Sequence, residues 1–153
     1  MRSVILAIAL FASTQAGASE VTVSEAWARA TAPGQHNGAV YLHITSRQDS
    51  RILAVSTPAA EDATLHSTIN DKGVMKMREL GTLLLPAGQQ VQLGAGATHI
   101  MLSGLKKPLV AGDSVPLTIT VQFTDKRREI VKVMAMVIPL TAKQQEQHHN
   151  HKH

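Results

Sequence analysis

The 153-residue chain contains no cysteine. This absence excludes disulfide bridges and every metal site that needs a thiolate, including the blue-copper type, whose ligands are two His and one Cys. Any soft metal ion would have to be bound by methionine thioethers and histidine imidazoles. The chain has six Met and eight His, so both of these donors are present.

Aromatic residues are also scarce, at 3% of the chain. Binding of single-stranded nucleic acid uses aromatic stacking platforms, so this composition argues against it. The net charge of +4 alone would suit nucleic acid, an anionic membrane or an acidic protein. No nucleic-acid motif occurs, and the densest basic run, Lys126-Arg127-Arg128, is interpreted as a solvated hairpin turn. We therefore expect no nucleic-acid partner.

Long helical periodicity is missing too, and a short helical turn is expected only near Ala60–Asp62. Instead, short alternating or β-branched runs are separated by turn signals, which favours an all-β sandwich or barrel in one domain. The expected strands are Val21–Ala30, Gly38–Thr45, Arg51–Ser56, Thr64–Ile69, Val74–Leu80, Thr82–Leu85, Gln90–Leu93, His99–Leu105, Pro116–Phe123 and Glu129–Ile138.

The N-terminus has the pattern of a secretory signal peptide. A short basic start is followed by an apolar run, Val4 to Ala12, which is too short to span a bilayer, and then by Ala16-Gly17-Ala18. The alternative is an anchor kept in the mature chain. We expect cleavage after Ala18, which assigns residues 1–18 to the signal, 19–142 to a β domain and 143–153 to a His-rich tail. This pattern predicts a periplasmic protein that does not span the membrane after cleavage.

A first candidate metal-binding segment runs from Leu65 to Met77, with the turn signal Asn-Asp-Lys-Gly at its centre. A two-residue loop at Asp71-Lys72, or a four-residue loop around it, would place His66 directly opposite Met77. Residues two apart on a strand share a face, so Met75 would point the same way. An odd-length loop would break this arrangement.

The second candidate segment contains His99 and Met101, which also share a face if the segment is extended. Two such pairs supply two imidazoles and two thioethers, an uncharged soft set that favours Cu(I) over Cu(II). Zinc more often recruits carboxylate or thiolate, and calcium or magnesium needs oxygen ligands. The competing interpretation is structural, because Met commonly fills core gaps and single His residues are usually hydrogen-bonded.

The spacing of these residues resembles a known signature. His66, Met77, His99 and Met101 follow the H-x10-M-x21-H-x-M pattern of the periplasmic copper chaperone family PCuA(C). The likeness covers roughly Val21 to Pro139 and includes the flanking segments Gly73–Arg78, His99–Leu102, Gly104–Lys106 and Val115–Thr118. It departs from the family where members often have Met directly after the first His, because Ser67 stands there.

The resemblance implies a cupredoxin-like Greek-key β-sandwich that binds Cu(I) through His66, Met77, His99 and Met101. It also implies delivery of the ion to the CuA centre of cytochrome c oxidase. The expected partner is a copper acceptor, such as oxidase subunit II or another copper chaperone, and the carrier is expected to be a monomer and not an enzyme. Met75 is then a spare thioether that shields the ion or substitutes for a ligand. The alternative function is copper buffering or resistance without a dedicated acceptor.

The tail offers a second candidate metal site, and some members of the resembled family have His- and Met-rich extensions that take up Cu(II). Here the accessory ligands are His148, His149, His151 and His153, without Met. His-rich tracts bind Cu(II), Ni(II) or Zn(II) with modest specificity. The alternative is an artificial purification tail, although Asn150 and Lys152 interrupt the run.

Four residues stand apart from these segments. His36 is isolated, and His43 is expected in the core or beside the metal ligands. Met134 and Met136 share a face of the last expected strand, where core packing is the expected role. The carboxylates form no catalytic pairing, and no nucleophile elbow occurs.

Overall fold

A computed structural model describes residues 17–141, which form ten strands and no helix. The strands are β1 Val21–Arg29, β2 Asn37–Ser46, β3 Ser50–Ser56, β4 Ala60–Asp71, β5 Val74–Leu80, β6 Leu83–Leu85, β7 Gln90–Leu93, β8 His99–Leu105, β9 Ser114–Phe123 and β10 Arg128–Ile138. The expected all-β class is confirmed, and every expected strand occurs.

The expected helical turn near Ala60–Asp62 is wrong. β4 already begins at Ala60, four residues before the expected start, because this segment pairs with the end of β8. Ala60 lies opposite Leu105 and Asp62 opposite Ser103. Backbone pairing with a strand far along the chain thus overrides the weak local pattern, which is the context dependence typical of β-structure.

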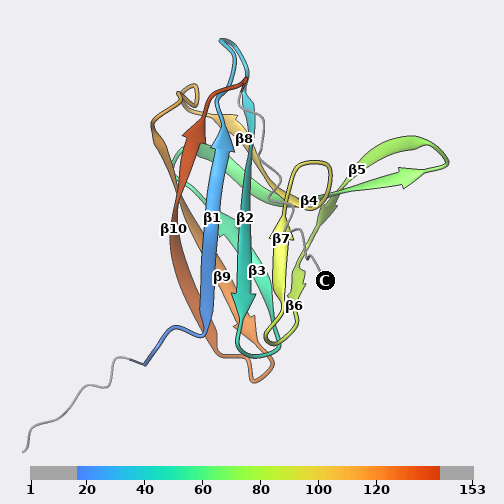
Figure 1. The fold of residues 1–153 in the computed structure, drawn as a ribbon, viewed down its shortest axis with the longest axis vertical. Helices are drawn as coiled ribbons and strands as arrows, with labels where there is room; N and C mark the ends of the chain where they lie inside the picture. The colour runs from blue at the N-terminus through green and yellow to red at the C-terminus, as the bar shows by residue number, and fades with distance from the viewer. Residues whose placement is uncertain (1–16, 142–153) are drawn as a thin grey trace, which may run out of the picture.

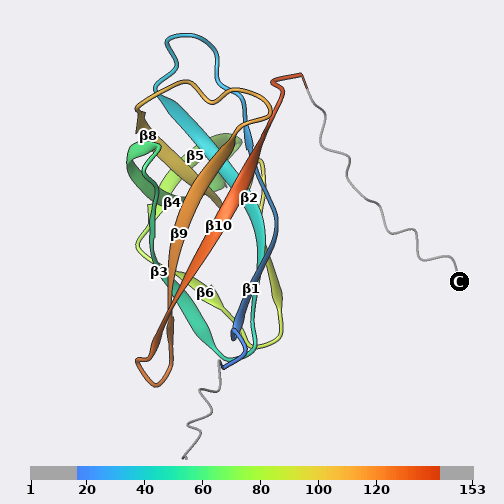
Figure 2. The same cartoon turned by 90° about the vertical axis from the view of Figure 1, so that its left-hand side faces the viewer.

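All ten strands belong to one hydrogen-bonded sheet in the order β5-β4-β8-β2-β1-β10-β9-β3-β6, and β7 also pairs with β2. The neighbours are antiparallel except for β1 and β10, which are parallel. The sheet curls, so β1 and β2 lie across the molecule from β3 (Figures 1 and 2). The result is the expected cupredoxin-like β-sandwich.

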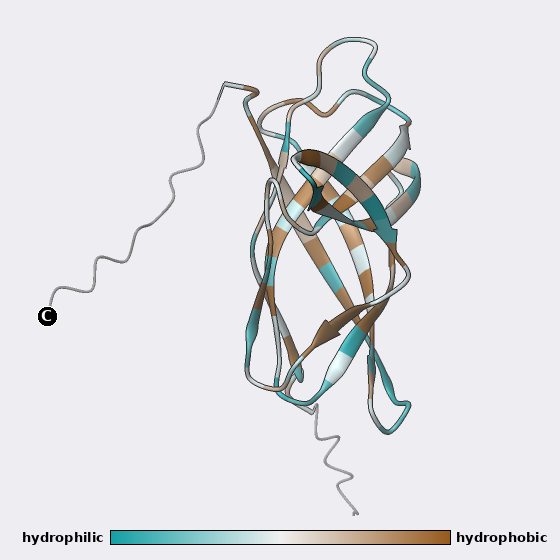
Figure 3. Ribbon diagram, turned by 90° about the vertical axis from the view of Figure 1, so that its right-hand side faces the viewer, coloured by the Kyte–Doolittle hydropathy of each residue, from teal (hydrophilic) through white to brown (hydrophobic). Residues whose placement is uncertain are grey.

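Alternation along the strands builds the core. In β2, Val40, Leu42 and Ile44 are almost fully buried, while the residues between them face outward. The same alternation in β9 buries Val115, Leu117, Ile119 and Val121. Figure 3 shows the resulting change between apolar and polar segments along the ribbons. One continuous apolar cluster therefore supports the sheet.

The β9–β10 turn contains the basic run and is solvent-exposed, as expected. The Asp125 carboxylate accepts a hydrogen bond from Nε of Arg127 at 2.6 Å and another from the Arg127 backbone N–H at 3.0 Å. The side-chain bond to Arg127 is the main reason that the pKa of Asp125 is lowered and that of Arg127 raised. These contacts close the turn.

Residues 17–141 contain no helix that is long and apolar enough to cross a lipid bilayer. Most of the predicted signal peptide, residues 1–16, and the tail from residue 142 lie outside the described residues.

Candidate metal centre

The two segments singled out above meet where β4 runs beside β8. His66 is the cross-strand partner of His99, and their ring centres lie 6.1 Å apart with nearly parallel planes. Met101 follows two residues after His99 on the same face and pairs with Thr64. Ile100 and Leu102 point to the other face and are fully buried. Sheet pairing therefore brings both His and one Met together.

The expected hairpin register is wrong by two residues. Lys72 and Gly73 form the loop, both with positive φ (51° and 85°), and Asp71 pairs with Val74. This is the geometry of a type I′ turn, and Asn70 Oδ1 supports it by accepting a hydrogen bond from the Gly73 N–H at 2.8 Å. The loop falls one position later than expected because only Gly73 suits the second central position.

The shift moves Met77 but keeps its face. Met77 pairs with Thr68, and Glu79 takes the place opposite His66. A shift of two residues preserves the side-chain alternation, so Met77 is a diagonal neighbour of His66, for which the usual separation is about 7–8 Å. Met75 lies one step farther along the same face, opposite Asn70. Both thioethers therefore lie on the face that holds His66, His99 and Met101, which we call the site face. They come from a hairpin that extends away from the body (Figure 1).

Burial is graded across these residues. His99 is 7% exposed, His66 and Met101 are half-buried, and Met77 is 51% exposed. The site face thus has a buried end at His99 and a solvent-facing end at Met77. An incoming molecule can reach the Met77 end without unfolding the sheet.

A backbone contact determines the tautomer of His99. Its Nδ1 lies 3.1 Å from the carbonyl oxygen of Ala97, which can only accept a hydrogen bond. Nδ1 must therefore carry the proton, and Nε2 has a free lone pair. This is the usual preparation of a metal-binding histidine, in which the second ring nitrogen orients the first.

His66 is held differently. Its Nε2 lies 2.9 Å from the Thr64 hydroxyl, while its Nδ1 is buried and has no hydrogen-bond partner among residues 17–141. A buried polar atom without a partner is costly. If Nε2 donates to Thr64, the Nδ1 lone pair is available, and a metal ion would satisfy it.

Two aromatic residues extend the site face, and sequence reasoning missed their role. The Tyr41 ring centre lies 6.2 Å from that of His99, and Trp27 lies 4.4 Å from Tyr41. They come from β2 and β1, so no sequence spacing relates them to His99. Thr64, by contrast, stands two residues before His66, and the same i, i+2 rule could have found it.

The donor types restrict the chemistry. No group of three His, Asp or Glu side chains that could hold a metal occurs within the described part of the chain. The residues on the site face therefore suit a soft ion bound by imidazole and thioether, and an oxygen-rich site for calcium or magnesium is absent there.

The remaining candidates are less closely placed. His43 is half-buried and not in the core, because it lies two residues after Tyr41 on the same outward face, where its Nδ1 is 3.3 Å from a Glu25 carboxylate oxygen. His36 is exposed. The expected core role of Met134 and Met136 is wrong, because they are 60% and 52% exposed. They occupy outward positions of β10, where the alternation buries Ala135 and Val137 instead. The tail histidines His148, His149, His151 and His153 lie outside the described residues.

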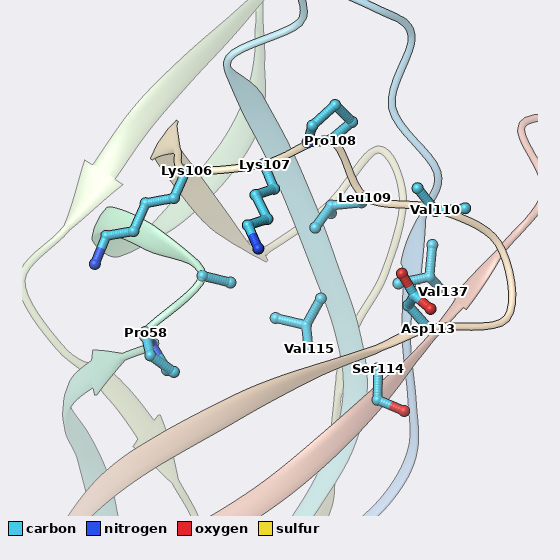
Figure 4. A pocket seen from close by; sticks show the side chains of 11 residues that line it. Pro58, Lys106, Lys107, Pro108, Leu109, Val110, Asp113, Ser114, Val115 and Val137 are labelled. Atoms are coloured by element: carbon cyan, nitrogen blue, oxygen red, sulfur yellow. The ribbon is translucent and has the colours of Figure 1, made fainter.

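A cavity of about 350 Å³ opens between the β3–β4 and β8–β9 connections (Figure 4). Lys106 and Lys107 border it together with Asp113, and apolar residues such as Leu109 and Val115 form its wall. No His or Met lines it, so it is separate from the site face.

Comparison with solved structures places this fold beside PCuAC domains. The solution structure of CuI-DR1885 from Deinococcus radiodurans is 31% identical, covers 82% of this chain and 83% of its own, and has a TM-score of 0.61. The copper-bound PCuAC domain from PmoF2 is 16% identical, with coverage of 80% and 96% and a TM-score of 0.63. The apo PCuAC domain from PmoF1 is 21% identical, with coverage of 78% and 95% and a TM-score of 0.59. The two PmoF likenesses concern the fold alone.

Sequence comparison identifies the family. The chain is 33% identical over 109 residues to "Putative lipoprotein Lxx21020" of Leifsonia xyli subsp. xyli, and 34% identical over 113 residues to the uncharacterized protein RP573 of Rickettsia prowazekii. The matches span 64% and 61% of those two proteins. The family model described as "Putative lipoprotein LpqE-like" matches residues 21–137. The chain therefore belongs to the LpqE-like family.

Proposed function

We propose that this protein is an exported copper carrier that binds one Cu(I) ion through His66, His99, Met101 and Met77. The observation that carries the proposal is the direct pairing of His66 with His99 across β4 and β8, with both thioethers on the same face. His66 Nδ1 has no hydrogen-bond partner among residues 17–141, and His99 Nε2 keeps its lone pair when Nδ1 donates to Ala97. With Nε2 of His66 donating to Thr64, both lone pairs can bind the ion.

The relatives support copper as the ion. CuI-DR1885 was determined with copper, and it is 31% identical to this chain over most of its length. The chemistry of two neutral imidazoles and two thioethers favours Cu(I) over Cu(II). The lipoprotein names of the family and of the Leifsonia relative support export to the cell envelope, and we propose the periplasm.

The graded exposure of the site supports transfer and not catalysis. An acceptor must exchange ligands one at a time, and Met77 offers an exposed first point of exchange. We propose that the acceptor is a copper protein such as the CuA subunit of cytochrome c oxidase or another copper chaperone. Buffering without an acceptor is the second candidate, and a chain that binds Cu(I) yet fails to load any purified acceptor would favour it.

The decisive experiment replaces both thioethers by Leu. Met77→Leu with Met101→Leu nearly preserves volume, so the fold should remain intact. Cu(I) binding should fall by at least a hundredfold, because two of the four ligands are lost. Anaerobic competition with a chromophoric Cu(I) chelator measures this, and Met134→Leu with Met136→Leu is the matched control. Unchanged affinity in the first variant would refute the ligand set.

We also propose that the tail captures Cu(II) through His148, His149, His151 and His153. Deletion of residues 144–153 should lower the number of Cu(II) ions bound per chain while leaving Cu(I) affinity unchanged, since the two sites use different donors. Titration of both ions into the full and shortened chains tests this. An unchanged Cu(II) stoichiometry would exclude the tail as a site.

A further inference from the structure

Among residues 17–141, no strand pairs with the outer edge of β5. β5 is the last strand of the sheet order, and six of its seven residues are exposed. An exposed edge offers backbone N–H and C=O groups to any extended chain that lies beside it. Figure 1 shows that the β4–β5 hairpin projects from the body, and within the described range the strand order ends at β5.

The hairpin register identifies which backbone groups are free. In an antiparallel pair, hydrogen-bonded and non-hydrogen-bonded positions alternate, and the pair that closes a two-residue loop is hydrogen-bonded. Asp71–Val74 is that pair, so Lys76 and Arg78 also bond to β4. The N–H and C=O groups of Met75, Met77 and Glu79 therefore point away from β4, toward the open edge.

The side chains of the edge alternate in chemistry. Met75 and Met77 share the metal-binding face with His66, whereas Lys76 and Arg78 lie on the opposite face. Lys76 Nζ is 2.6 Å from Asp71 Oδ2, and Arg78 takes part in no ion pair among residues 17–141. One face of the edge thus holds the two thioethers, with the exposed Glu79 following them opposite His66, and the other face has a net positive charge.

We propose that a copper-accepting protein docks by adding an extended segment to the β5 edge. This segment has soft ligands (Cys, Met or His) at alternate positions and Asp or Glu between them. Its main chain hydrogen-bonds to Met75 and Met77, which places its ligands within cross-strand distance, about 5 Å, of those thioethers. Its acidic residues face Arg78 and Lys76. The inference rests on the proposed copper function and names the class of partner.

The proposal accounts for Met75, which the four-ligand set leaves without a role. An acceptor ligand opposite Met75 or Met77 would meet a thioether before it meets the buried His99. Docking therefore precedes exchange, and copper leaves from the exposed end of the site.

The test uses the full chain loaded with Cu(I) and a blocked seven-residue peptide of alternating Asp and Met. Met75→Pro removes one outward N–H without breaking a hairpin bond, and Met75→Leu is the matched control that keeps the N–H. We expect amide NMR signals of Met77 and Glu79 to shift on peptide binding. Both variants lack the Met75 thioether, so their comparison isolates the backbone N–H. Affinity should be about tenfold lower in Met75→Pro than in Met75→Leu, the equivalent of a hydrogen bond and its steric fit.

Two further peptides keep the test independent of how well the proline variant folds. A version that is N-methylated at the residues facing β5 should bind about tenfold more weakly, and so should a version with Lys in place of Asp. Equal binding of all three peptides, or shifts located away from β5, would overturn the proposal. Cu(I) affinity is measured separately for each variant. If the unaltered chain did not bind Cu(I), the copper function itself would be refuted. If it bound Cu(I) normally but β5 did not respond to the peptide, only the docking proposal would be refuted.

Discussion

His66 and His99 differ in what orients their rings, and the difference has consequences. The backbone of Ala97 holds His99, so no side-chain substitution removes that contact. The Thr64 hydroxyl holds His66, and this contact can be removed selectively. Hydrogen bonds to the second nitrogen of a metal-binding His commonly change metal affinity by 10–100-fold.

Thr64→Val should therefore weaken Cu(I) binding by roughly 10–100-fold with little change in volume, because His66 loses its orienting partner. Thr64→Ser keeps the hydroxyl and should retain most of the affinity. Competition against a Cu(I) chelator compares the two variants. Equal affinity for Val and Ser would mean that Thr64 does not orient His66 in the loaded site.

The four proposed ligands were identifiable one pair at a time. The i, i+2 spacing relates His99 to Met101, because alternation is a local property of a strand. The pairing of His66 with His99 joins residues 33 positions apart, and no local pattern specifies it. Only the spacing of the resembled family suggested that His66 and His99 lie together. In the structure they are neighbours because β4 pairs with β8. Tyr41 could not be related to His99 for the same reason.

At the level of the hairpin, the turn determines where Met77 lies. Asn70, Asp71, Lys72 and Gly73 all favour turns, so several two-residue loops compete in the sequence. Gly73 decides between them, because its φ of 85° is accessible to glycine at little cost. The strands other than β4 were predictable to within two residues at each end, whereas the register of β4 against β5 depends on this one position.

Gly73→Ala should loosen the β4–β5 hairpin by about 1 kcal/mol, because an alanine at this φ is strained. If the hairpin must close to present Met77, Cu(I) affinity should fall about fivefold. Gly81→Ala is the control, since no atom lies within 4 Å of the added Cβ and its φ lies outside the left-handed range. Chelator competition measures both variants, and equal affinities would show that Met77 binding does not depend on the turn.

At the scale of the whole molecule, the site is formed by strands that lie far apart in the sequence. β4, β5 and β8 contribute the proposed ligands, and β1 and β2 contribute the aromatic residues beside them. A metal ion bound across β4 and β8 can exist only when the sheet has formed. Copper binding must therefore be coupled to the stability of the entire domain.

The expected size of this coupling can be estimated. Free Cu(I) buffered at 100 times its Kd stabilises the folded state by about 2.7 kcal/mol, provided that the unfolded chain does not bind. For a domain of this size, the corresponding rise in melting temperature is about 10 °C. Anaerobic thermal unfolding of the chain lacking residues 144–153 measures it without interference from the tail. The Met77→Leu, Met101→Leu variant should melt at the temperature of the metal-free protein under the same copper concentration. A shift of equal size in that variant would place the ion elsewhere in the sheet. Only an ion that binds the folded state raises the melting temperature, so an undiminished rise would mean that the folded protein binds copper without Met77 and Met101.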